Sequence, residues 1–157
     1  MMRRLLFAVV LLALLAGCGE TTPTVVPFHS TGIGATVSEW EAVNGKTDAM
    51  GKSRSPYQIA DNKTYIVTLL RDWSGTSGPT LDAARSEIKG MLPDDATLVR
   101  TVPSSGKYGT KELYHSASLA KRAPASVWQT GAPGDIIIGF AVTGGHVTSI
   151  IADLGAQ

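Results

Sequence analysis

The feature that most constrains the fold is a pair of β-rich runs near the end of the chain. Asp135–Val142 and Val147–Ala152 consist mainly of β-branched, aromatic and small residues, and Gly144-Gly145 lies between them. Two glycines in this setting are typical of a two-residue hairpin turn, because both adopt positive φ at no steric cost. We therefore expect the two runs to form neighbouring antiparallel strands.

The register of this hairpin follows from the position of the turn. Counting outward from the glycines places Val142 opposite Val147 and Phe140 opposite Ser149. Because opposite residues share a face, apolar side chains then appear on both faces of the hairpin. We expect helices or a second layer to cover at least part of each face.

Two segments have the patterns of helices. Thr36 and Glu39 form a capping box, and Asn44-Gly45 supplies the stop, with Val37, Trp40 and Val43 expected on the packed face. The second helix spans Thr80–Leu92, and its apolar residues recur at helical spacing. Its stripe consists of Leu81, Ala84, Ile88 and Met91.

The remaining elements are short. We expect strands at Tyr57–Ala60, Lys63–Trp73, Thr97–Val102 and Lys111–Tyr114, and a helical turn at Ser116–Arg122. This order predicts an α+β domain: a mostly antiparallel sheet of about five or six strands, with two main helices packed on one face.

The first residues of the chain have the layout of a secretory signal. Arg3 and Arg4 precede the apolar run Leu5–Leu15, and small residues follow. Eleven residues form a helix of about 16 Å, whereas a membrane span needs about 20 residues. A transmembrane anchor is therefore not expected here.

Leu15-Ala16-Gly17-Cys18 resembles the lipobox of bacterial lipoproteins. The resemblance implies that Cys18 carries acyl chains and becomes the first mature residue, so that the membrane is its partner through those chains. It also implies export and anchoring to the outer face of the cell membrane or the outer membrane. The expected division is a signal peptide over 1–17, the lipidated cysteine and a flexible tether over 18–32, and a single domain over 33–157.

The composition of the exported part narrows the classes of function. Cys18 is the only cysteine, so no disulfide framework is available. Without Arg3 and Arg4 the chain has 12 basic residues against 13 acidic ones. This balance argues against nucleic acid as a partner.

The sequence contains no recognisable catalytic, metal or cofactor site. His115-Ser116 is the only adjacent pair of a base and a hydroxyl, but neighbours on a strand point to opposite faces. His29 lies in the expected tether and His146 on a hairpin turn, and the spacing does not suggest zinc. The aromatic residues, among them Trp40, Trp73 and Trp128, are either core residues or a surface that stacks on a ligand, with the core favoured.

Two further resemblances concern the exported domain. The capped helix and glycine in Ile33–Gly45, followed by strands, resemble small lipoproteins of outer-membrane protein assembly and β-lactamase-inhibitor-like folds. Leu92–Ala96 and Gly134–Ile151 resemble uncharacterised bacterial lipoproteins. The expected function is a non-enzymatic, lipid-anchored binding or scaffold module with an envelope protein as a possible partner. The alternatives are an inhibitor-like module acting on an extracellular enzyme and, third, an enzyme with an unrecognised site.

Overall fold

The computed structural model describes residues 27–104, 106–128 and 131–155. They form one antiparallel sheet of six strands in the order β1-β2-β6-β5-β4-β3, together with helices, and the predicted α+β class is confirmed. The elements are α1 (Val37–Asn44), β1 (Gln58–Asp61), β2 (Ile66–Asp72), α2 (Leu81–Lys89), β3 (Thr97–Pro103), β4 (Thr110–His115), α3 (Ala117–Arg122), the 3-10 turn η1 (Ala125–Val127), β5 (Asp135–Thr143) and β6 (His146–Leu154).

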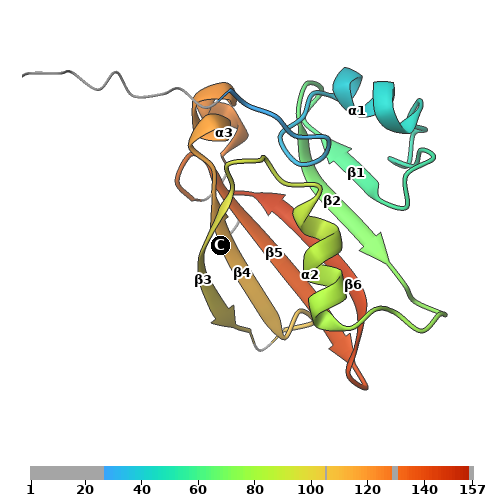
Figure 1. The fold of residues 1–157 in the computed structure, drawn as a ribbon. Helices are drawn as coiled ribbons and strands as arrows, with labels where there is room; N and C mark the ends of the chain where they lie inside the picture. Colours follow the sequence, from blue (N-terminus) through green and yellow to red (C-terminus); the bar gives the residue numbers. More distant parts are fainter. Residues whose placement is uncertain (1–26, 105, 129–130, 156–157) are drawn as a thin grey trace, which may run out of the picture.

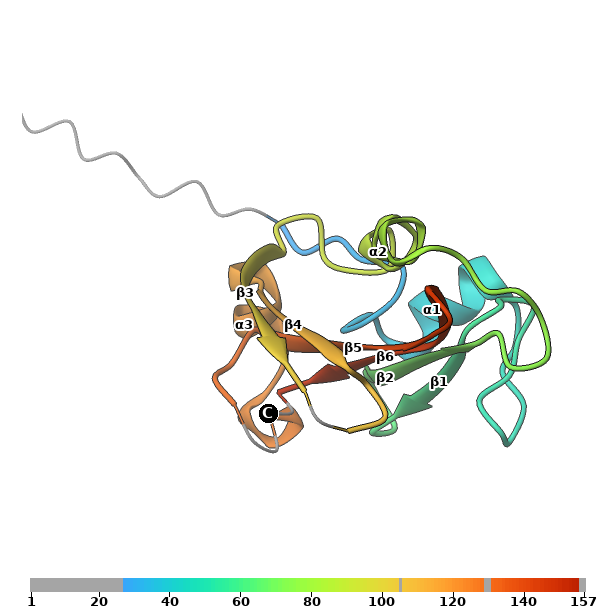
Figure 2. The same cartoon turned by 90° about the horizontal axis from the view of Figure 1, so that it is seen from below.

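The two main helices lie on the same side of the sheet (Figures 1 and 2). Trp40 of α1 and Ile88 of α2 join one buried cluster with Ile138 and Phe140 of β5 and Ile150 of β6. The main core cluster therefore lies between the helices and one face of the sheet. Leu113 and Ala141, which alternate with core residues along β4 and β5, are buried outside this cluster. No helix among the described residues is long and apolar enough to cross a membrane.

The capping residues of α1 behave as the sequence predicts. The Glu39 N–H donates to the Thr36 hydroxyl, and the Glu39 carboxylate accepts from the Thr36 N–H. Trp40 is fully buried, but Val43 is 66% exposed, so the expectation that Val43 packs is wrong. Val43 lies in the last turn of α1 and lines a surface pocket instead of joining the core.

The β5–β6 hairpin forms as predicted, with φ of 59° at Gly144 and 82° at Gly145. Val142 lies opposite Val147, but the expected pairing of Phe140 with Ser149 is wrong, since Phe140 faces Ile150.

A bulge beside Thr148 causes this shift of register. The register changes between Ala141 and Val142, which leaves Thr148 as an extra residue on β6. Its carbonyl accepts a hydrogen bond from the Trp73 N–H at 2.9 Å. The shift by one residue turns Phe140 and Ile150 toward the helices together, as expected when one strand gains an extra residue.

Candidate functional site: the entry of the chain into the domain

The chain enters the domain along a fixed path. The Asp94 N–H donates to the His29 carbonyl at 3.0 Å, and the Ile33 N–H donates to the Met91 carbonyl at 2.9 Å. Between them the Ser30 hydroxyl donates to the Ile33 carbonyl at 3.0 Å. The part of the expected tether from residue 28 to residue 32 therefore lies against the loop between α2 and β3, and the tether is shorter than the sequence predicts.

Arg122 of α3 clamps this segment. Its guanidinium carbon lies 4.3 Å from the centre of the Phe28 ring and 5.9 Å from that of Tyr65. One guanidinium nitrogen also donates to the Glu39 carboxylate at 2.6 Å. One arginine of α3 thus joins the incoming chain to α1 and to Tyr65, just before β2, and a cation over two aromatic faces stabilises the contact.

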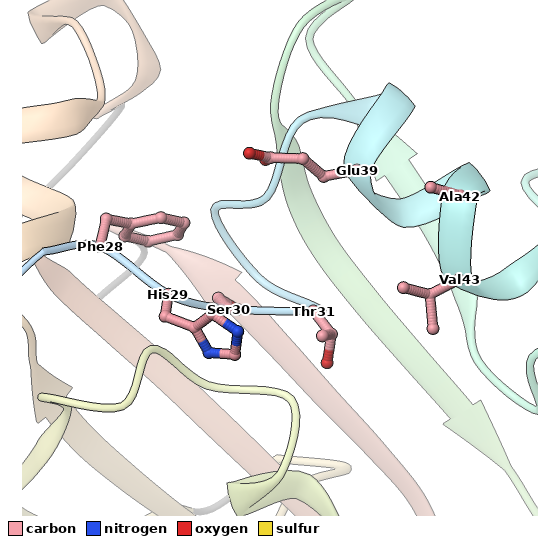
Figure 3. Close-up of a pocket in the computed structure, with 7 residues that line it drawn as sticks. All are labelled: Phe28, His29, Ser30, Thr31, Glu39, Ala42 and Val43. Carbon is pink, nitrogen blue, oxygen red and sulfur yellow. The ribbon is translucent and has the colours of Figure 1, made fainter.

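Glu39 takes part in both the clamp and the helix cap, and its side chain points from α1 toward the Phe28 segment (Figure 3). Burial raises the pKa of Glu39, but the hydrogen bonds from Thr36 and Arg122 outweigh burial and leave this pKa below its ordinary value. The carboxylate therefore stays charged at neutral pH, as the ion pair with Arg122 requires.

A shallow pocket of about 270 Å³ lies beside the clamp, and Figure 3 shows the side chains that line it. They are Phe28, His29, Ser30, Thr31, Glu39, Ala42 and Val43. The volume is just below the range of about 300–1,000 Å³ for small-molecule sites. Its imidazole, hydroxyls and carboxylate offer hydrogen bonds to a small polar group, and within the described ranges no three His, Cys, Asp or Glu residues are grouped so as to hold a metal ion.

The structure separates His115 from Ser116, the pair considered for nucleophilic catalysis. His115 Nδ1 lies 3.0 Å from Asp135 Oδ1 at the end of the β4–β5 ladder. Ser116 is fully buried, and its hydroxyl donates to Asp95 at 2.6 Å. The base and the hydroxyl therefore have different partners and do not form a catalytic pair.

Asp95 is held by the first turn of α3, a contact that links two segments distant in sequence. Its carboxylate accepts from the hydroxyls of Ser116 and Ser118 at 2.6 and 2.7 Å and from the Ser118 N–H at 2.8 Å. Burial raises the pKa of Asp95, but these hydrogen bonds outweigh it and hold the pKa below its ordinary value. Asp95 therefore caps α3 from outside the helix, which is why neighbouring Asp94 and Asp95 have separate roles.

Replacing Asp95 with asparagine is expected to lower the free energy of unfolding at pH 7 by about 1 kcal/mol, the usual magnitude for a lost cap or a charged hydrogen bond. A lowered carboxyl pKa contributes stability at neutral pH that is lost as the pH falls through the folded-state pKa. The free energies of unfolding of the wild type and Asp95→Asn should thus become more similar as the pH falls. Urea unfolding at several pH values measures this change. Asp94→Asn is the matched control, because the Asp94 side chain is 70% exposed and its contact with the equally exposed His29 imidazole, at 3.2 Å, is a surface ion pair that contributes little to stability. A difference in the free energy of unfolding that stays constant with pH would contradict the assignment of Asp95 as a cap of α3.

Sequence reasoning missed the buried carboxylate of Glu112 on β4. The side chain is 2% exposed, and its oxygens accept from Arg85 Nε at 2.7 Å and from the Tyr114 hydroxyl at 3.0 Å. Burial, followed by the charge of Glu112, raises the pKa of Tyr114 to about 12. Both carboxylate oxygens have partners, and the ion pair between Glu112 and Arg85 links β4 to α2. The sequence does contain one indication of this contact. Side chains alternate between the two faces of a strand, so Glu112 and Tyr114 share a face in the expected strand Lys111–Tyr114.

The tryptophans pack with the core. Trp40 is fully buried, and Trp73 and Trp128 are half-buried against the core cluster. The Arg71 guanidinium lies 4.6 Å from the Trp73 ring. The described tryptophans therefore do not present a shared open face for stacking on a ligand.

Comparisons with protein-family models, with curated proteins and with solved structures found no match in any of the three. The expected lipobox residues Leu15, Ala16 and Gly17, and Cys18, which is expected to carry the lipid, lie outside the described residues.

Proposed function

We propose that this chain is a lipid-anchored envelope lipoprotein that acts as a non-enzymatic binding or scaffold module. The anchor is Cys18, on the sequence pattern given above. The structural observation that carries the proposal is the Arg122 clamp on Phe28, ten residues after that cysteine. A domain that works at the end of a lipid anchor benefits from a fixed exit point for the chain.

The contact between Arg122 and Phe28 also determines which end of the domain lies nearer the membrane in this proposal. Phe28 and α3 lie at one end of the sheet, and the turn between β5 and β6 lies at the other (Figure 1). Ten residues reach about 35 Å when fully extended. The α3 end therefore stays close to the membrane in this proposal, and the far end of the sheet is free to meet a partner in the envelope.

In-cell cross-linking of the tagged full-length chain tests the binding role. Exposed lysines at positions 46, 107 and 121 surround the domain and react with an amine-directed cross-linker. We expect one discrete adduct of higher mass in the membrane fraction, with one envelope protein identified in it. The same chain with Cys18→Ser is the matched control and should lose the adduct, since the domain is no longer held at the membrane. A lipidated wild type that forms no adduct would reject the binding role.

A further inference from the structure

The two outer edges of the sheet differ. Beside β1, the Ile59 N–H donates to the Gly51 carbonyl at 2.9 Å, and a Cβ on Gly51 would lie only 2.0 Å from the Ile59 carbonyl oxygen. The loop around Gly51 therefore covers that edge closely. At the other edge, β3 pairs with β4 on one side, and within the described ranges its second side has no backbone partner.

The side chains of β3 are also open to solvent. Six of its seven residues are exposed, and only Val102 is half-buried. Leu98 and Val99 are 51% and 56% exposed and are adjacent in sequence. Both belong to β3, the strand at the margin of the sheet in Figure 1. Unpaired backbone groups beside two large apolar side chains form a template for another strand.

The charge at this edge is positive. Thr97–Pro103 contains Arg100 and no acidic residue. Arg100 lies opposite Leu113 and Val102 lies opposite Lys111, so Arg100 and Lys111 project from the same face. A strand added beside β3 would therefore place its own side chain against a cation on that face.

The features of β3 disfavour pairing of its outer side with a second copy of the chain. The register of β3 shifts between Leu98 and Arg100, and the strand ends at Pro103, both of which limit unselective pairing. An antiparallel copy centred on Arg100 would oppose two guanidinium groups, and like charges directly opposite each other are destabilising. A segment with a carboxylate at that position meets attraction instead.

We propose that β3 takes up an extended, acidic segment of an envelope protein as a seventh strand of the sheet. The backbone of the segment pairs with the outer side of β3, its carboxylate faces Arg100, and its apolar residues contact Leu98 and Val99. Main-chain pairing supplies the affinity in this mode of recognition, and the side chains supply the selectivity. The inference rests on the proposed binding role and names its surface.

Two synthetic peptides test this surface with the full-length lipidated protein in detergent. Both have about eight residues, alternate threonine and valine, and differ only in a central glutamate or lysine. We expect the glutamate peptide to bind wild type about fivefold to tenfold more tightly and to slow amide hydrogen exchange in residues 98–102. Arg100→Glu should reverse the preference, whereas Lys46→Glu, with the same change of charge at a distant exposed site, should leave it unchanged.

Each other outcome overturns the inference. Equal binding of the two peptides, protection of another strand, or an unchanged preference in Arg100→Glu would reject β3 as the surface. A wild-type dimer in sedimentation, with exchange protection at β3, would assign the edge to a second copy instead. A discrete adduct in cells without peptide selectivity would reject only the β3 surface, whereas absence of the adduct would reject the binding role itself.

Discussion

Phe140→Ala is expected to lower the free energy of unfolding by about 3–5 kcal/mol, the range for removing a buried phenylalanine ring. Phe140 is fully buried at the middle of β5, opposite Ile150, and belongs to the cluster that α1 and α2 cover. The loss combines the transfer free energy of the ring with the cost of the cavity left behind. Because a domain of this size has a total stability of about 5–15 kcal/mol, the variant should be close to unfolding at growth temperature.

Urea unfolding of the variant measures this effect, with Val142→Ala as the matched control on the same strand. Val142 is 42% exposed near the hairpin turn, so its truncation should change the free energy of unfolding by less than about 0.5 kcal/mol. Similar losses at both positions would contradict the assignment of the helix-covered face as the core.

Cys18→Ser is expected to abolish incorporation of radiolabelled palmitate when the full-length chain is expressed in a bacterial host. A thiol, reacting as the thiolate, forms the thioether bond to lipid, and the serine hydroxyl is a far weaker nucleophile. Two or more acyl chains hold a protein stably on a membrane, whereas one gives only marginal binding. We therefore expect the wild type in the membrane fraction, and the variant either unprocessed or soluble.

Thr21→Ser is the control for this experiment, because it changes a residue of the same segment and keeps the lipobox intact. It should incorporate label as the wild type does. Label in Cys18→Ser equal to that in the wild type would place the modification elsewhere.

Local chemistry made much of the fold predictable. The cap at Thr36 and the turn at Gly144-Gly145 depend on neighbouring residues and are present as expected. Each is set by hydrogen bonds or φ angles within a few residues, and such interactions leave a clear trace in the sequence.

Contacts between distant segments could not be predicted in this way. Thr148, the extra residue of the bulge, accepts a hydrogen bond from Trp73, and Phe28 packs against Arg122, 94 positions later in the chain. Asp95 likewise receives its partners from α3. In each case the residue types are ordinary, and only the sheet order brings the partners together.

The candidate site was the least predictable feature. Its residues come from the incoming segment, α1 and α3, and the sequence assigned the incoming segment to a tether. The burial and pairing of Glu112 could not be predicted for a related reason, because Glu112 lies on β4 and its partner Arg85 lies on α2.

The intact mass of the protein purified from the membrane fraction is the most direct test of the lipid anchor. We expect a chain that lacks residues 1–17, begins at Cys18, and carries the added mass of two or three acyl chains at its N-terminus. A chain that retains the first 17 residues, or one that begins near Cys18 without added lipid mass, would contradict the anchor and with it the proposed function.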